Sequence, residues 1–221
     1  FGKASGFDAQ INLSTVNGSN GFRLSGEHVV DQLGSSVSSA GDVNGDGFDD
    51  VIVDAPGADP NGLNSGAIYV VLGKASGFAA QIDLSKLDGS NGFRLDGEHE
   101  YDSTGSIVSA AGDVNGDGLD DVIIGTPFSD TNSQDSGSSY VVFGKVSGFD
   151  AQMDLSSLDG SNGFRLDGEK VGDLSGLSVS GAGDVNGDGF ADVIVGAPAT
   201  SQNGPLSGTS YVVFGKASGF D

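Results

Sequence analysis

One acidic segment of the chain carries side chains whose types and spacing could bind a metal ion. Residues Asp42–Asp50 read DVNGDGFDD, which places oxygen-bearing side chains at positions 1, 3, 5 and 9 of a glycine-containing loop. Alternate positions in a tight loop can turn toward one centre. Hard divalent cations take about six to eight oxygen ligands, and calcium accepts them at flexible angles. The segment therefore predicts a calcium-binding loop.

The same segment recurs at Asp113–Asp121 and at Asp184–Asp192, each time after 71 residues. In every copy we expect side-chain oxygens from positions 1, 3, 5 and 9 and the backbone carbonyl of position 7 as ligands, which explains why Leu119 can replace Phe48. The pattern predicts three Ca²⁺ sites, one per repeat. The expected ligands are Asp42, Asn44, Asp46, Phe48, Asp50, Asp113, Asn115, Asp117, Leu119, Asp121, Asp184, Asn186, Asp188, Phe190 and Asp192.

An Asp/Asn/Gly-rich turn without a metal is the alternative interpretation of each loop. Three aspartates converging to about 5 Å would repel by about 3 kcal/mol per pair at an effective dielectric of about 20, and the arrangement occurs three times, which favours calcium. An EF-hand is excluded because position 12 is apolar, Val53 in the first copy, where that loop needs a glutamate. Position 8 is not counted as a ligand because Asp49 and Asp120 become Ala191 in the third copy.

The chain as a whole is a tandem array. Its 221 residues make three units of 71 and eight more, and the last eight, Phe214–Asp221, repeat the first eight, Phe1–Asp8. Self-similarity at such a period is typical of stacked supersecondary units. We predict one repeat segment over 1–221, with units at about 1–71, 72–142 and 143–213, and with 214–221 starting a further repeat.

Each unit is expected to contain four short strands, which in the first full copy are Ser35–Ala40, Asp50–Asp54, Ala67–Leu72 and Gly92–Asp96. A short extra strand is expected at Ile82–Leu84. Glycine-containing turn pairs separate these runs and no stretch has sustained helical periodicity, so the prediction is all-β. Four strands per unit in tandem predict β-propeller blades, with the small first strand at the crowded centre and the fourth at the rim. The chain does not begin at a blade boundary, so Gly21–Ser25 is expected to be a fourth strand without the other three, and the last blade is expected to lack its fourth strand.

Three blades are fewer than the roughly four to eight of closed propellers. We therefore expect that two chains make a six-bladed ring, that the units belong to a longer array, or that open edges join chains in a filament. The expected partners are further copies of the chain or adjacent repeats of a longer one.

Composition narrows the class of protein. With 31 acidic and 9 basic residues the formal charge is −22, which excludes a nucleic-acid-binding face and opposes adhesion to an anionic membrane surface. The chain has no cysteine, hence no disulfide or thiolate site. No apolar run is long enough for a membrane span, and no signal peptide is visible, so we expect a processed product or an excerpt of a longer protein.

Other polar residues are expected to be structural. Arg94 and its equivalents are expected to pair with a nearby acid such as Asp96 or Glu98. The only histidines, His28 and His99, are expected to be solvated near a turn. No GxSxG elbow or P-loop is present, so no catalytic or cofactor-binding residue and no enzyme activity are predicted.

The segments DVNGDGFDDVIVDAP, DVNGDGLDDVIIGTP and DVNGDGFADVIVGAP resemble the FG-GAP repeats of integrin α-chain propellers and their bacterial relatives. The resemblance covers all three units, although the GAP element is intact only at Gly196–Pro198. It implies that the loop joins the first and second strands of a blade and binds calcium through the ligands named above.

These observations predict a non-enzymatic, calcium-binding β-propeller module, structural or adhesive, from the extracellular space or the cell surface. A cell-surface protein or a glycan is a candidate partner. The alternative is a self-assembling fibre or sheath subunit joined blade to blade. A glycan-binding or catalytic propeller is a third, less favoured interpretation.

Overall fold

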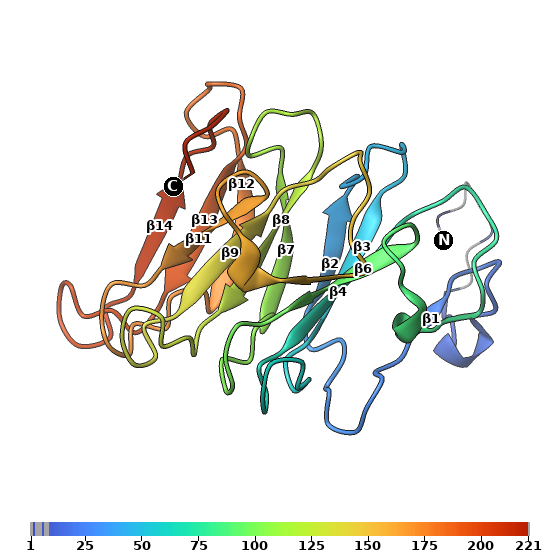
Figure 1. The fold of residues 1–221 in the computed structure, drawn as a ribbon, viewed down its shortest axis with the longest axis horizontal. Coiled ribbons are helices and arrows are strands. Elements are labelled where there is room, and N and C mark those ends of the chain that lie inside the picture. The colour runs from blue at the N-terminus through green and yellow to red at the C-terminus, as the bar shows by residue number, and fades with distance from the viewer. Residues whose placement is uncertain (1, 3–5, 7–8, 221) are drawn as a thin grey trace.

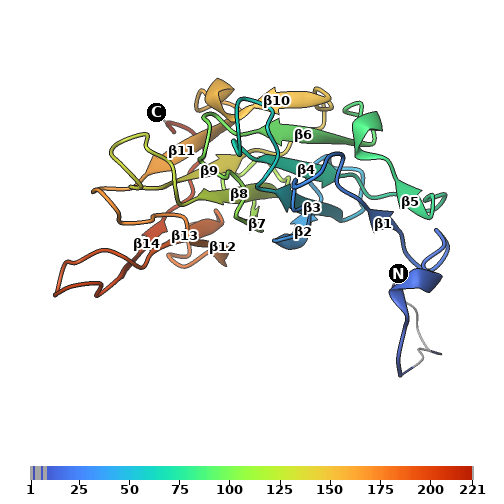
Figure 2. The same cartoon turned by 90° about the horizontal axis from the view of Figure 1, so that it is seen from below.

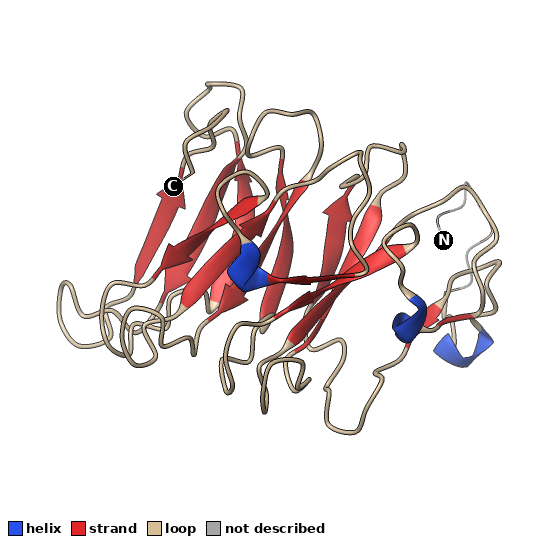
Figure 3. Cartoon of the chain, viewed as in Figure 1, coloured by secondary structure: helices blue, strands red, loops and turns tan. Residues whose placement is uncertain are grey.

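The computed structural model describes residues 2, 6 and 9–220. Within this part of the chain, almost all regular structure is β-strand (Figures 1 and 3). The first sheet holds β2 (Val37–Gly41), β3 (Asp50–Ala55), β4 (Ala67–Val71) and β6 (Gly92–Asp96), the second β7 (Ile107–Gly112), β8 (Asp121–Thr126), β9 (Ser138–Val142) and β11 (Gly163–Asp167), and the third β12 (Ser178–Gly183), β13 (Asp192–Ala197) and β14 (Thr209–Val213). The remaining elements are β1 (Arg23–Leu24), β5 (Gln81–Ile82), β10 (Gln152–Asp154) and the 3-10 turns η1 (Leu13–Thr15), η2 (Leu84–Lys86) and η3 (Leu155–Ser157).

The four predicted strands of the first unit are confirmed within two residues at their ends. The expected extra strand is confirmed only in part, because β5 covers Gln81–Ile82 and the chain then turns into η2 at Leu84. The reason is local, since the Asp83 side chain accepts a hydrogen bond from the Ser85 N–H at 3.1 Å and starts a 3-10 turn.

Each large sheet is an antiparallel meander of consecutive strands, which is the structure of a propeller blade. The first strands lie at the inner side, where β7 contacts both β2 and β12. Figure 2 shows the succession from β2 through β3 and β4 to β6 and β10 at the outer side. Small side chains make the close approach of the inner strands possible, as the sequence predicts. The all-β, blade-like architecture is therefore confirmed.

Apolar side chains between consecutive sheets hold the blades together. Ile52 and Ile68 of the first sheet lie in one buried cluster with Val108 and Tyr140 of the second. An equivalent cluster joins the second sheet to the third and includes Val193. Because burial of apolar surface is the main stabilising term, each blade depends on its neighbour for stability.

The rim of the array is held by short parallel strand pairs. The start of each unit adds to the fourth strand of the preceding one, so that β5 pairs with β1 and β10 pairs with β6. A phenyl ring reinforces the pairing, since Phe149 stacks on Phe93 of β6 with ring centroids 3.9 Å apart. A hairpin cannot make such a parallel contact, so it links units that are separated by a whole blade.

The three blades form an open row in the described part of the chain. The small sheet of β1 and β5 lies at one end and the sheet that ends in β14 lies at the other (Figure 1). No strand pair joins these two ends among the described residues. In the same part of the chain, no helix reaches the length and hydropathy that a membrane crossing requires.

Candidate metal centre

Each predicted calcium loop connects the first and second strands of a blade, as the resemblance implies. The first loop leaves β2 at Gly41, where the register against β3 shifts, and enters β3 at Asp50. Gly47 has φ +86°, a left-handed conformation that a side chain would strain, and the equivalent glycines of the other loops share it. The sequence thus folds each loop into the same tight turn.

The aspartate at position 1 organises the loop by accepting backbone hydrogen bonds. In the first loop, Asp42 Oδ1 accepts from the N–H groups of Gly45 at 2.8 Å and Asp46 at 3.1 Å, and Oδ2 accepts from Gly47 at 2.8 Å. The other two loops repeat this pattern. A carboxylate that accepts hydrogen bonds from three backbone N–H groups stabilises the turn, because it takes the role that backbone carbonyls have in regular structure.

Positions 3 and 5 face each other across the loop. The Asn44 amide donates to Asp46 Oδ2 at 3.0 Å, and the Asn44 oxygen accepts from the Asp46 N–H at 3.0 Å. Asp46 Oδ1 in turn accepts from the Phe48 N–H at 2.9 Å. The structure brings positions 1, 3 and 5 together in every loop, with their oxygens turned toward the backbone of the same turn.

The aspartate at position 9 is buried at the base of the loop. Asp50 Oδ2 accepts from the Val43 N–H at 2.9 Å, and its Oδ1 accepts from the Gly73 N–H at 2.7 Å. Gly73 follows the third strand, so this carboxylate ties the loop to two strands of its own blade. Asp121 and Asp192 make the equivalent pairs of hydrogen bonds.

Burial affects the ionisation of two of the position-9 carboxylates, Asp50 and Asp121. It raises the pKa of Asp50 to about 6, partly offset by the two backbone N–H groups, and the negative charges of Asp46 and Asp42 add to the rise. Burial also raises the pKa of Asp121 to about 7. The carboxylates of positions 1 and 5 thus act on position 9 as like charges.

The side chain at position 7 covers the preceding loop. A Cβ on Gly45 would lie 2.9 Å from Leu119 Cδ2, and a Cβ on Gly116 would lie 2.3 Å from the ring of Phe190. The position-7 side chain therefore has a packing role between loops, while its carbonyl is the atom expected to bind metal. Phe48 has no preceding loop in the described chain and is exposed.

The residue at position 8 has a contact that the sequence did not indicate. Asp120 Oδ2 accepts a hydrogen bond from the Asp42 N–H at 2.9 Å, which links the loop of the second blade to the loop of the first. Gly41 permits this approach, because a Cβ there would lie 2.2 Å from the same oxygen. Ala191 lacks the carboxylate, so the second and third loops have no such contact. The change from aspartate to alanine at position 8 is the one sign of this contact in the sequence, and it does not reveal that Asp42 is the partner of Asp120.

The donor set fits a hard cation, since every expected ligand is an oxygen of aspartate, asparagine or the backbone. Within the described residues, no three carboxylate or imidazole side chains come together as a group able to hold a metal ion. The hydrogen bonds above explain this finding, because the loop carboxylates face their own backbone N–H groups and one ligand per loop is an amide. Calcium binding is therefore taken up below as a proposal.

The other polar candidates have structural environments. Arg94 pairs with Asp96 at 2.5 Å, and Arg165 contacts both Asp167 at 2.7 Å and Glu98 at 3.3 Å, as predicted for these arginines. The third equivalent, Arg23, instead bonds the side chain of a glutamine, Gln81. The side chains of both histidines are largely exposed, in agreement with the expectation of solvated residues.

Comparison with known proteins finds relatives among integrin alpha chains and a phospholipase D. The chain is 33% identical over 174 residues to integrin alpha-PS5 of Drosophila melanogaster, covering 78% of this chain and 16% of the relative. It is 32% identical over 181 residues to integrin alpha-5 of Xenopus laevis, covering 80% and 16%. It is also 28% identical over 211 residues to a phosphatidylinositol-glycan-specific phospholipase D of Dictyostelium discoideum, covering 89% and 21%. The chain thus spans about a fifth or less of these relatives.

The family profile described as FG-GAP repeat matches residues 33–71, 104–142 and 175–213. Each match contains the first three strands of a blade and the complete loop between the first two. The matches together cover more than half of the chain and have the spacing of the loops. The chain therefore belongs to the FG-GAP repeat family and is an integrin-like, three-bladed segment of β-propeller type.

Proposed function

We propose that the chain is a calcium-binding structural or adhesive module that works outside the cell. The observation that supports this most strongly is the threefold repetition of one oxygen-rich loop with one hydrogen-bond pattern. In the first loop, Asp42, Asn44, Asp46 and Asp50 would hold the ion through their side chains and Phe48 through its carbonyl. The ion would supply positive charge beside Asp50, whose pKa the like charges of Asp46 and Asp42 help to raise.

The calcium affinity expected of such loops supports an extracellular setting. Calcium sites of extracellular modules bind with dissociation constants of about 10⁻⁴ to 10⁻³ M, so they fill outside cells and stay empty at cytosolic calcium. Three bound ions would change the formal charge of −22 by +6, to −16. The similarity to integrin chains supports an adhesive role with a cell-surface protein or a glycan as partner.

We propose no catalytic function for the chain. The phospholipase D relative supports an enzyme only through its name, and this chain matches 21% of it. The oxygen-rich loops also occur in three equivalent copies, and the sequence distinguishes no acid/base pair from its repeats.

The test is a thermal melt of the chain in calcium, in magnesium and after exhaustive chelation with EDTA. Calcium should raise the melting temperature and titrate with three equivalents in calorimetry, because binding to the folded loops alone stabilises the folded state. Identical melting curves in calcium and EDTA would overturn the proposal.

A further inference from the structure

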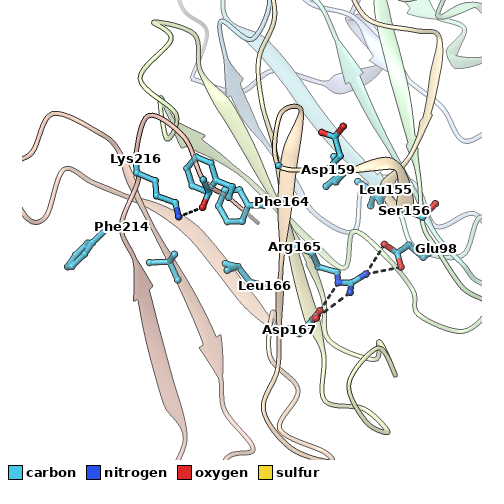
Figure 4. A pocket seen from close by; sticks show the side chains of 15 residues that line it. Glu98, Leu155, Ser156, Asp159, Phe164, Arg165, Leu166, Asp167, Phe214 and Lys216 are labelled. Atoms are coloured by element: carbon cyan, nitrogen blue, oxygen red, sulfur yellow. Dashed lines mark hydrogen bonds and ion pairs between the residues drawn. The ribbon is translucent and has the colours of Figure 1, made fainter.

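A groove of about 600 Å³ runs beside β11 at the outer side of the second blade (Figure 4). Phe164 and Leu166 of β11 form part of its wall, and Leu155 of η3 and Phe214 of the C-terminal segment line it too. Polar groups mark its rim, where Arg165 pairs with Asp167 and Glu98. The groove is separate from the candidate metal loops, which connect the first and second strands of each blade.

The same location is filled twice elsewhere in the molecule. Next to β6, the equivalent of β11, lies β10, with Gln152 opposite Arg94 and Met153 opposite Leu95. Next to β1 lies β5, with the equivalent register. β11 has no such neighbour among the described residues. Because β6 and β11 have the same sequence, GFRLD, the empty edge of β11 is built to receive a parallel strand of the same kind.

The segment that would fill the groove is present at the other end of the chain. Ala9–Thr15 reads AQINLST and corresponds to the segments that begin with β5 and β10. Leu13 is 82% exposed, whereas its equivalents Leu84 and Leu155 are 3% and 1% exposed. The apolar side chain of this position is thus buried in the other two copies and exposed to solvent in the first.

The blade faces at the two ends show the same mismatch. Val37 on the first strand of the first blade is 67% exposed, against 4% and 6% for Val108 and Val179. At the other end, Val185 is 60% exposed, although its equivalents Val43 and Val114 are covered by the next blade at 2% and 1%. Each end therefore exposes one of the two surfaces that meet between neighbouring blades, and the complementary surface is exposed at the opposite end.

We propose that the groove beside β11 and the outer face of the third blade bind the N-terminal part of a second copy of this chain. From residue 9 onward, residue i of the second copy would take the place of residue i + 213, where 213 is three repeats of 71. The positions before residue 9 are held by the C-terminal segment of the first copy, whose Phe220 stacks on Phe164. Gln10 of that copy would then lie opposite Arg165 and Ile11 opposite Leu166, as in the two internal pairings. Its residues near Arg23 would pair with the open edge of β14 opposite Tyr211, as Arg94 pairs with Tyr69.

Such a contact is heterologous, because the two surfaces that meet are different. Heterologous contacts lead to rings or to filaments, depending on the rotation per chain, and both products would use the same pair of surfaces. The end face of the third blade includes Val185 of the third loop, so assembly is measured both in calcium and in EDTA.

The test uses one variant that blocks each end. Ile11→Asp/Leu13→Asp changes exposed side chains of the segment, and Val212→Asp changes an exposed side chain of β14 whose equivalents in β4 and β9 are buried. Val171→Asp, at an exposed site away from both surfaces, is the matched control. Analytical ultracentrifugation measures the mass of each protein, and circular dichroism with thermal melting confirms that each is folded. Phe214→Ser, in the wall of the groove, replaces Val212→Asp should that variant not fold.

The wild type and Val171→Asp should form particles larger than one chain, and each end variant alone should be monomeric. An equimolar mixture of the two end variants should give a heterodimer that does not grow, because it retains one intact pair of surfaces. A monomeric wild type at its highest soluble concentration would assign the groove to another occupant and overturn the proposal. End variants that assemble like the wild type, or a mixture without heterodimer, would overturn it equally. Measurements in calcium and in EDTA separate this result from that of the melting test.

Discussion

Asp120 in the second loop accepts a hydrogen bond from the backbone N–H of Asp42 in the first, with 2.9 Å between Oδ2 and N. The backbone adds a weaker link in the reverse direction, from the Asp120 N–H to the Asp42 carbonyl at 3.3 Å. Asp42 is also the residue whose carboxylate organises the first loop. The two loops are therefore joined by two hydrogen bonds at the point where the first one begins.

We expect Asp120→Ala to lower the free energy of unfolding by about 1 to 2 kcal/mol, because a hydrogen bond with a charged acceptor is lost between two blades. Calcium binding to the first loop should weaken, since Asp42 loses a restraint. Chemical denaturation and calorimetry provide the two measurements. Asp49→Ala is the matched control, because Asp49 has the same loop position and is exposed. Equal losses in both variants would contradict a role for the contact.

The third loop offers the reverse experiment. Ala191 stands where the second loop has Asp120, and its N–H donates to the Asp113 carbonyl at 2.9 Å, so the backbone is already in place. Ala191→Asp should therefore introduce an acceptor for the Asp113 N–H and raise the melting temperature. A lower melting temperature would show that the added negative charge outweighs the new hydrogen bond.

Removal of one loop ligand should remove one calcium site. We expect Asp188→Ala to reduce the stoichiometry from the proposed three to two, because Asp188 is the proposed position-5 ligand of the third loop alone. Calcium at about ten times its dissociation constant stabilises by roughly 1.4 kcal/mol per site, so the calcium-dependent part of the unfolding free energy should fall by about that amount. Titration calorimetry and melting in calcium measure both effects. Asp150→Ala, an exposed aspartate outside the loops, should leave three sites.

The buried carboxyl of Asp54 should make stability depend on pH. Burial raises its pKa to about 6 from an unfolded value near 3.8, and although Oδ1 accepts from the Ser36 N–H at 2.7 Å, Oδ2 has no hydrogen-bond partner among the described residues. The folded state therefore binds the proton more tightly than the unfolded state. The cost of the ionised group is fully present above pH 6 and disappears as the pH falls toward 4.

Asp54→Asn should consequently stabilise the chain at pH 7 by up to about 3 kcal/mol and have little effect near pH 4. Gly125 and Gly196 stand at the equivalent positions, so the acidic side chain is not required by the fold. Denaturation at both pH values measures the difference. A stabilisation that is the same at pH 4 and pH 7 would show that the charge is not its cause.

The stacked rings at the rim should contribute measurably to stability. Phe149 stacks on buried Phe93, and the Lys145 ammonium lies 5.0 Å from the Phe149 ring centroid. Phe149→Ala should cost about 2 kcal/mol, since it removes a partly buried ring and exposes Phe93. Phe128→Ala, at a residue that is 44% exposed, should cost less, about 0.5 to 1 kcal/mol. Similar costs for the two variants in chemical denaturation would contradict a role for the stack.

Much of the fold was accessible from sequence because its signals are local and repeated. Turn residues mark the ends of each strand, and three nearly identical copies confirm one another, so the positions of strands such as Asp50–Ala55 and of the loops were predicted well. The oxygen-rich spacing of Asp42, Asn44 and Asp46 is also local, and the structure brings these side chains together in one turn.

The tertiary structure decided what each copy meets. Asp120 contacts Asp42 although 78 residues separate them, and Leu119 packs over Gly45. The strand β10 belongs to the unit after that of β6 and pairs with it. None of these partners can be inferred from a pattern inside one unit. Equivalent residues also differ in their surroundings, as Leu13 and Leu155 show. The physical reason is that periodicity and turn chemistry determine local conformation, whereas burial and long-range hydrogen bonds depend on which neighbouring blade is present.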